Sequence, residues 1–279
     1  MKTRIISGTV IALVFVALAV AGSFFPLAYS FAAAVLGALA LFEMLYNTGF
    51  CKNFPTIIAG CLFVIFSAFS QFIDVELYAL ALAVFLFISA TIGVLLHKKL
   101  RINSVFGAIA LSVTVSITVR FVSLLLCQGY GLFYLCYIIG CTSIADTGAY
   151  FIGVRFGKHK MIPSVSPKKS WEGLIGGLLC GTIFAVLILV IFDILKNAHI
   201  YSISPNKALT VGMAPVLVLA GVIGDLFTSL LKRESNIKDF VNIIPGHGGF
   251  ADRLDSLLFV APLMYLIDSI SSFAGIIAK

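Results

Sequence analysis

Long apolar runs separated by short polar segments dominate the 279-residue chain. Nine of these runs are long enough, as helices, to cross the roughly 30 Å hydrocarbon core of a bilayer. The pattern therefore predicts an all-α, polytopic integral membrane protein with about nine transmembrane helices. No polar stretch is long enough for a separate soluble domain, so residues 1–279 are expected to form a single membrane-embedded domain. The predicted spans lie near residues 5–21, 24–46, 55–73, 75–96, 104–127, 132–152, 173–195, 209–231 and 256–276.

Composition agrees with a membrane location. The chain is 61% hydrophobic and 11% charged, whereas a soluble domain carries about 25% charged residues. The first apolar run follows Lys2 and Arg4 and ends in "ALAVAGS", which also fits a signal-peptide cleavage site. We prefer a retained first helix, because proteins with many spans often begin in this way.

The basic residues predict the orientation. With nine spans, the amino terminus and the loops after the second, fourth, sixth and eighth spans share one side, which holds 15 of the 19 Lys and Arg residues. The opposite side, which includes the carboxyl terminus, holds three, and Arg120 lies within a span. The positive-inside rule makes the basic side cytoplasmic. The formal charge of +7 is therefore a one-sided topology signal and predicts no nucleic-acid partner.

Two aspartates fall within predicted spans. Asp146 and Asp225 lie towards the cytoplasmic ends of the runs at 132–152 and 209–231. A charge at the centre of a span costs on the order of 3 kcal/mol, so such a residue is normally functional or paired. Asp225, Ser229 and Lys232 share one helical face at i, i+4 and i+7. A buried ion pair between Asp225 and Lys232 is therefore the alternative to a functional role.

The polar segment "IIPGHGGFADRLDS" (243–256) lies between the last two spans. Its "PGHGG" turn can adopt positive φ and lets backbone amides approach an anion closely. Asp252 and Asp255 follow at i and i+3, on one face at the entry to the last span. Carboxylate oxygens are suitable ligands for Mg²⁺, which commonly retains waters and substrate phosphates as its other ligands. The segment predicts a site for a metal ion and a polyphosphate at the cytoplasmic boundary.

A second polar segment, residues 145–173, follows the sixth span. It contains Asp146 at its start, a series of basic residues and Glu172 near its end. Such a run of basic residues also serves as a topology signal that contacts lipid headgroups. The intramembrane position of Asp146, and the joining of two lysines to Glu172 in "SPKKSWEG", favour a functional role instead. The basic residues are Arg155, Lys158, Lys160, Lys168 and Lys169.

The two segments together carry a family resemblance. Residues 229–255, "SLLKRESNIKDFVNIIPGHGGFADRLD", resemble the signature of the phosphatidate cytidylyltransferases, or CDP-diacylglycerol synthases. "ADTGAYFIG", "FGK" and "SPKKSWEG" resemble the other recurring stretch of that family, so the signature regions are 145–173 and 225–256. The first hundred residues match only in hydropathy. Ser170 stands where threonine is common in the family, and it retains the hydroxyl group.

The resemblance implies a reaction in which CTP and phosphatidic acid give CDP-diacylglycerol and pyrophosphate. It further implies a Mg²⁺ requirement (with a second cation as an open alternative), a multi-pass protein of the cell membrane whose active site faces the cytoplasm, and a homodimer. Family knowledge places metal binding on Asp225 and Asp252, with Asp255 and Asp239 as further carboxylates at or near the metal. His247 is expected to donate a hydrogen bond or fix the turn, with a general base as the alternative. The expected phosphate partners are Lys168, Lys169, Lys232, Arg233 and Arg253, and the further candidates are Asp146, Glu172, Ser229 and Lys238.

Two other functional classes remain open at this point. A CTP-dependent lipid kinase, or a CDP-lipid synthase for a different lipid phosphate, would use the same substrates or closely related ones. An ion-coupled transporter could use Asp146 and Asp225 as a relay. A relay needs charges along a path through the membrane, however, and these charges gather at one side.

Overall fold

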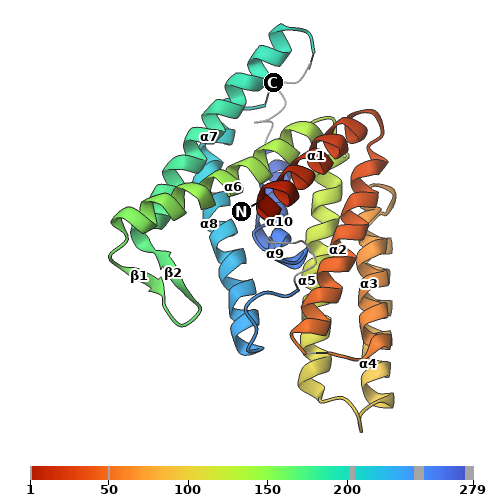
Figure 1. Ribbon diagram of the computed structural model, residues 1–279. Coiled ribbons are helices and arrows are strands. Elements are labelled where there is room, and N and C mark those ends of the chain that lie inside the picture. Colours follow the sequence, from red (N-terminus) through yellow and green to blue (C-terminus); the bar gives the residue numbers. More distant parts are fainter. Residues whose placement is uncertain (1, 50, 201–204, 242–247, 274–279) are drawn as a thin grey trace.

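The computed structural model describes residues 2–49, 51–200, 205–241 and 248–273, and it is almost entirely helical (Figure 1). Nine longer helices and one short helix, α9, make up this part of the chain. The helices are α1 (Lys2–Phe24), α2 (Leu27–Asn47), α3 (Phe54–Ala68), α4 (Val75–Leu95), α5 (Ile102–Leu126), α6 (Gly131–Phe156), α7 (Trp171–Asn197), α8 (Lys207–Glu234), α9 (Ala251–Leu254) and α10 (Leu257–Phe273).

The predicted all-α membrane class is confirmed. Each predicted apolar run overlaps one of the longer helices, and within the described ranges six of them, α2 and α4 to α8, are long and apolar enough to span a bilayer. Helix α3 is shorter than the run at 55–73 because it ends at Ala68 and a 3₁₀ turn, Ser70–Phe72, follows. The total of nine membrane crossings stays a prediction.

A small β-hairpin between α6 and α7 was not predicted. Strands β1 (Lys160–Ile162) and β2 (Ser166–Ser170) pair antiparallel, with Lys160 opposite Ser170. The segment "SPKKS" thus forms a strand. Pro167 is compatible with this strand because both strands of a two-stranded sheet are edges, where a missing N–H is tolerated. Ser170 then caps α7, since its side chain accepts a hydrogen bond from the Gly173 N–H.

Small residues bring α6 and α7 together. A Cβ atom on Gly148 would lie 2.4 Å from the Cys180 sulfur, and one on Gly177 would lie 3.0 Å from the Ala145 carbonyl oxygen. Such close approach is typical of helix contacts inside membranes, where small residues let two backbones pack directly. This tight pair positions the hairpin that connects its two helices (Figure 1).

Helix α10 joins the two parts of the fold. Helices α2, α3 and α5 pack against one another on one side, α6, α7 and α8 do so on the other, and α10 contacts both α5 and α8. At Gly224 of α8, a Cβ atom would lie 2.4 Å from the Asp255 carbonyl oxygen. The glycine therefore lets α8 lie directly on the α9–α10 junction. This contact brings Asp225 beside Asp255, two positions that are 30 residues apart in the sequence.

Candidate active site

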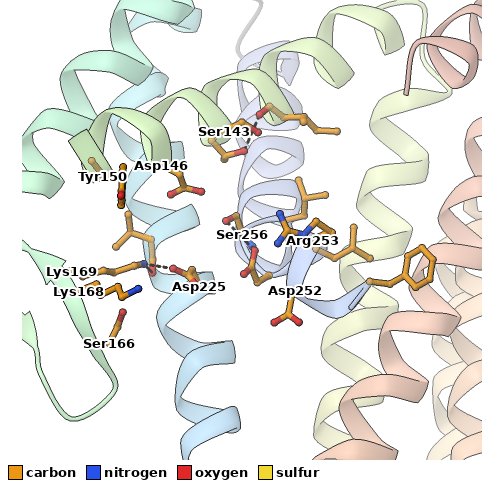
Figure 2. Close-up of a pocket in the computed structure, with 18 of the residues that line it drawn as sticks. Ser143, Asp146, Tyr150, Ser166, Lys168, Lys169, Asp225, Asp252, Arg253 and Ser256 are labelled. Atoms are coloured by element: carbon orange, nitrogen blue, oxygen red, sulfur yellow. Dashed lines mark hydrogen bonds and ion pairs between the residues drawn. The ribbon is translucent and has the colours of Figure 1, made fainter. Parts of the chain in front are cut away.

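A cavity of about 1290 Å³ lies among α1, α6, β2, α8 and the α9–α10 segment. Figure 2 shows Asp146, Lys168, Lys169 and Asp225 on one side of it and Asp252, Arg253 and Ser256 on the other. Residues of both signature regions therefore line one cavity. The predicted site residues that line it are Asp146, Lys168, Lys169, Asp225, Asp252, Arg253 and Asp255.

The remaining wall of the cavity is apolar. Val10, Val14, Phe15 and Leu18 of α1 line it, together with Leu36 of α2. A ligand in this cavity thus meets charged groups at one end and hydrocarbon side chains at the other. An amphipathic molecule with an anionic head matches this division, because burial of its apolar part is favourable at roughly 25 cal/mol per Å².

Asp225 is held by a lysine from the hairpin. The Lys169 ammonium lies 2.6 Å from Asp225 Oδ2, and the Ser229 hydroxyl donates to Oδ1 at 3.4 Å. The ion pair between Asp225 and Lys232, considered as an alternative from their shared helical face, is therefore not the one formed. Strand β2 delivers Lys169 to Asp225, and Lys232 pairs elsewhere.

Asp252 is oriented from several directions. Lys232 Nζ lies 2.7 Å from Oδ1, and the backbone N–H groups of Gly249 and Phe240 donate to Oδ2 at 3.1 and 3.4 Å. The two side chains of the Lys232–Asp252 ion pair are only 10% and 8% exposed. Gly248 has φ of +78°, which confirms the expected positive φ in the glycine turn. The turn and Lys232 together fix the direction of this carboxylate.

Negative charge accumulates around Asp225. Asp225 lies close enough to both Asp146 and Asp255 for its negative charge to repel theirs. Burial, reinforced by Asp225, raises the pKa of Asp255, which lies between α9 and α10. Closely spaced carboxylates repel one another unless a cation neutralises them.

A Mg²⁺ ion fits this donor set. Across the described residues, no three His, Cys, Asp or Glu side chains are close enough to hold a metal by themselves. Mg²⁺ is usually bound through one or two carboxylates, with waters and substrate phosphates completing its coordination. The oxygen donors of the cavity therefore suit an ion that arrives with a polyphosphate.

Other predicted residues lie away from the cavity. Arg233 donates from Nε to the Val165 carbonyl oxygen at 3.3 Å and so fastens the hairpin loop to α8. Glu172 pairs with His159 at 2.6 Å, within the hairpin region. Lys238 and Asp239 are exposed. None of these residues lines the cavity, and neither do Ser229 and Lys232, which lie behind Asp225 and Asp252. His247 lies outside the described residues.

Sequence reasoning missed several residues of this region. Ser143, Tyr150, Ser166 and Ser256 line the cavity (Figure 2), and no spacing rule distinguishes them from other small polar residues. Glu43 was also missed, although a signal existed. It is the only acidic residue in the apolar run at 24–46, and an acid within a span is normally paired or functional.

Known proteins with similar sequences belong to one family. A sequence model described as the cytidylyltransferase family matches residues 2–270. A phosphatidate cytidylyltransferase of Bacillus subtilis is 32% identical, with 96% of this chain and 97% of that protein covered. Proteins of the same name from Staphylococcus saprophyticus and Staphylococcus haemolyticus are 31% and 30% identical, each over 96% of this chain and 98% of their own length. The chain belongs to the cytidylyltransferase family.

Proposed function

We propose that this membrane protein transfers CMP from CTP to phosphatidic acid, giving CDP-diacylglycerol and pyrophosphate. The observation that carries the proposal is the cavity, whose charged end adjoins an apolar wall from α1 and α2. Phosphatidic acid has the matching division into an anionic headgroup and acyl chains. Relatives named phosphatidate cytidylyltransferase match nearly the whole chain, which supports the same substrates here.

The proposed reaction is a substitution at phosphorus. An oxygen of the lipid phosphate forms a bond to the α-phosphorus of CTP, and the bond from that phosphorus to the bridging oxygen of the β-phosphate breaks. Pyrophosphate leaves with the electron pair. A phosphate monoester has a second pKa of about 6 and is already largely dianionic at neutral pH. The nucleophile therefore needs no strong general base.

Charge neutralisation is the main task of the site. Two anions must approach each other, and negative charge moves onto pyrophosphate during transfer. Lys168, Lys169 and Arg253 line the cavity and are the groups that we assign to the phosphates. Donors held in place before the reaction stabilise this charge without reorganisation. Arg253 and Lys168 come from opposite sides of the cavity (Figure 2), so they are suited to different phosphates.

We assign Mg²⁺ to the carboxylates of Asp225 and Asp252, with Asp255 beside them. When bound, the ion would neutralise phosphate oxygens and align the triphosphate, and a second cation could share this role. The hydrogen bonds to Asp252 are compatible with this assignment, because each carboxylate oxygen has more than one lone pair. Asp225 and Lys169 together would contact both the cation and a phosphate.

Product analysis tests the proposed reaction. Purified protein is incubated with Mg²⁺, phosphatidic acid and CTP labelled in the cytidine. We expect a labelled, lipid-soluble CDP product and one pyrophosphate for each lipid converted. A CTP-dependent lipid kinase would instead release labelled CDP into the aqueous phase. A synthase for another lipid phosphate would leave phosphatidic acid unused and would react with that lipid.

Two further parts of the proposal concern the membrane and the assembly. The concentration of Lys and Arg on one side of the predicted topology supports a cytoplasm-facing active site in the cell membrane. The family resemblance supports a homodimer, which cross-linking in native membranes tests. An ion-coupled transporter is less well supported, since Asp146 and Asp225 line the same cavity as the lysines and do not mark a path across the bilayer.

A further inference from the structure

Glu43 of α2 is a buried carboxylate outside both signature regions. Its relative exposure is 1%, and its neighbours Leu41, Met44 and Leu45 belong to an apolar cluster that also contains Ala251. Its Oε2 atom accepts a hydrogen bond from the Ala251 N–H at 2.9 Å, while Oε1 is buried without a hydrogen-bond partner. A buried, partly satisfied carboxylate is costly. An apolar residue of similar size would avoid that cost, but it would leave the buried Ala251 N–H without its acceptor.

The carboxylate of Glu43 also defines the space at Gly249. A Cβ atom on Gly249 would lie 2.3 Å from Glu43 Oε2 and 3.0 Å from Cδ. A side-chain carbon on residue 249 would therefore overlap the Glu43 carboxylate. Gly249, the third glycine of the "GHGG" sequence, therefore leaves room for the Glu43 carboxylate, whereas Gly248 allows a positive φ.

The segment held by Glu43 is the one that orients Asp252. Gly249 N–H donates to Asp252 Oδ2 at 3.1 Å, and Ala251 N–H donates to Glu43. Phe250, at the start of α9, provides no side-chain cap. Glu43 supplies this missing acceptor from a helix more than 200 positions earlier in the chain. Since α2 is fixed by packing against α3 and α5, the hydrogen bond attaches the glycine turn to a rigid helix.

We infer that Glu43 is a positioning residue that holds residues 249–252, so that the Asp252 carboxylate points into the cavity. Glu43 itself does not line the cavity, whereas Asp252 does, so it acts through Asp252. The inference rests on the proposed function, because it takes Asp252 as a Mg²⁺ ligand. Residues that orient metal ligands typically alter metal affinity or activity by about 10–100-fold when they are replaced.

The Mg²⁺ activation curve tests this role, and the rise in melting temperature with added Mg²⁺ gives a second readout that does not depend on turnover. Glu43→Leu removes the acceptor while keeping an apolar volume, and we expect the half-activating Mg²⁺ concentration to rise by about tenfold or more. Glu43→Gln retains an oxygen that can accept from Ala251 N–H, so its curve should stay close to that of the wild type. Glu234→Leu is the matched control, because Glu234 is an exposed glutamate at the carboxyl-terminal end of α8 and its loss should leave the curve unchanged.

A double-mutant cycle provides a second test that does not depend on Glu43→Leu folding. Gly249→Ala should by itself raise the half-activating Mg²⁺ concentration, because the new methyl group displaces the turn from Glu43. In a Glu43→Ala background the space is vacant, so Gly249→Ala should add little further change. Non-additivity of this kind reports direct coupling between two residues.

The outcomes separate the inference from the proposed function. An unchanged Mg²⁺ curve for Glu43→Leu, equal damage from Glu43→Gln and Glu43→Leu, or simple additivity in the cycle would each overturn the positioning role. A wild-type protein that makes CDP-diacylglycerol without responding to Mg²⁺ would refute the metal site and the inference with it. A wild-type protein that makes no CDP-lipid at all would refute the proposed reaction.

Discussion

At the residue scale, each of the two main carboxylates of the site is paired with a lysine from another part of the chain. Lys169 of β2 holds Asp225 at 2.6 Å, and Lys232 of α8 holds Asp252 at 2.7 Å. The first pair is open to the cavity, with side chains 21% and 30% exposed, whereas the second is nearly buried. An ammonium group has three donors, so Lys169 can keep Asp225 while it binds a phosphate. Lys232 instead serves to orient Asp252.

Asp225→Asn is expected to lower kcat by at least about 100-fold, on the scale seen when a key electrostatic contact at a reaction centre is removed. The amide keeps the shape and one oxygen but loses the charge that neutralises Mg²⁺. Turnover at saturating Mg²⁺, with size-exclusion chromatography as the check on folding, measures this. A well-folded variant with near-normal turnover would remove Asp225 from the proposed metal site.

Lys168→Ala is expected to raise the KM for CTP or for phosphatidic acid. Lys168 is exposed on the cavity wall, and no ion pair holds it in the described part of the chain. It is thus free to bind a phosphate equally in the ground and transition states, which affects KM more than kcat. If its contact strengthens as pyrophosphate departs, kcat falls instead. Lys98→Ala, an exposed lysine in another polar loop, is the control; equal damage there would mean that basic charge in general, and no specific contact, is responsible.

The residues of the site were predictable where chemistry and local spacing coincide. Asp225 was identified because it is a charged residue within a predicted span, and Asp252 and Asp255 because they are carboxylates beside a glycine turn. Their partners were not, because helical periodicity relates only residues a few positions apart. The Lys232–Asp252 pair crosses a turn, and Glu43 meets Ala251 across 208 positions. Such contacts depend on helix packing, which the sequence pattern does not encode.

At the element scale, the site depends on how closely α8 approaches the α9–α10 junction. The apolar runs predicted the long helices well, since a run of about 20 apolar residues is a strong signal. The β1–β2 hairpin lacks that signal, because its strands are only three and five residues long. Yet the hairpin carries Lys168 and Lys169. The close contact at Gly224 could not be predicted either, because a glycine within a helical sequence does not indicate which backbone packs against it.

Gly224→Ala is expected to reduce both activity and thermal stability. Its Cβ atom would lie 2.4 Å from a backbone oxygen, that of Asp255, and backbone cannot rotate away as a side chain can. Helix α8 must then shift, which moves Asp225 relative to Asp255. Gly212→Ala in the same helix is the matched control, because its Cβ atom meets nothing within 4 Å; there the change should be neutral, or stabilising by up to about 1 kcal/mol. Melting temperature and kcat are measured for the two variants. Equal effects of Gly224→Ala and Gly212→Ala would show that helix propensity, and not the contact with Asp255, accounts for the change.

At the scale of the whole molecule, the arrangement unites a membrane lipid with a water-soluble nucleotide. The apolar wall of the cavity comes from α1 and α2, and the charged end comes from α6, β2, α8 and the α9–α10 segment. Neither half of the chain contains the complete cavity. Because CTP is a cytoplasmic nucleotide, the proposed function requires the charged end to face that compartment, and the orientation of the whole chain becomes part of the proposed mechanism.

The orientation is tested with cysteines placed on opposite sides of the predicted topology. Lys158→Cys lies in the exposed segment between α6 and β1, and Asn197→Cys lies at the exposed end of α7. An impermeant maleimide should label Asn197→Cys in intact cells, and should label Lys158→Cys only after the membrane is permeabilised. The native cysteines are buried or half-buried, so the unmodified protein gives the background. Rapid labelling of Lys158→Cys from outside, in a variant that retains activity, would place the charged end of the cavity on the side without CTP. It would therefore overturn both the predicted topology and the proposed access of the nucleotide.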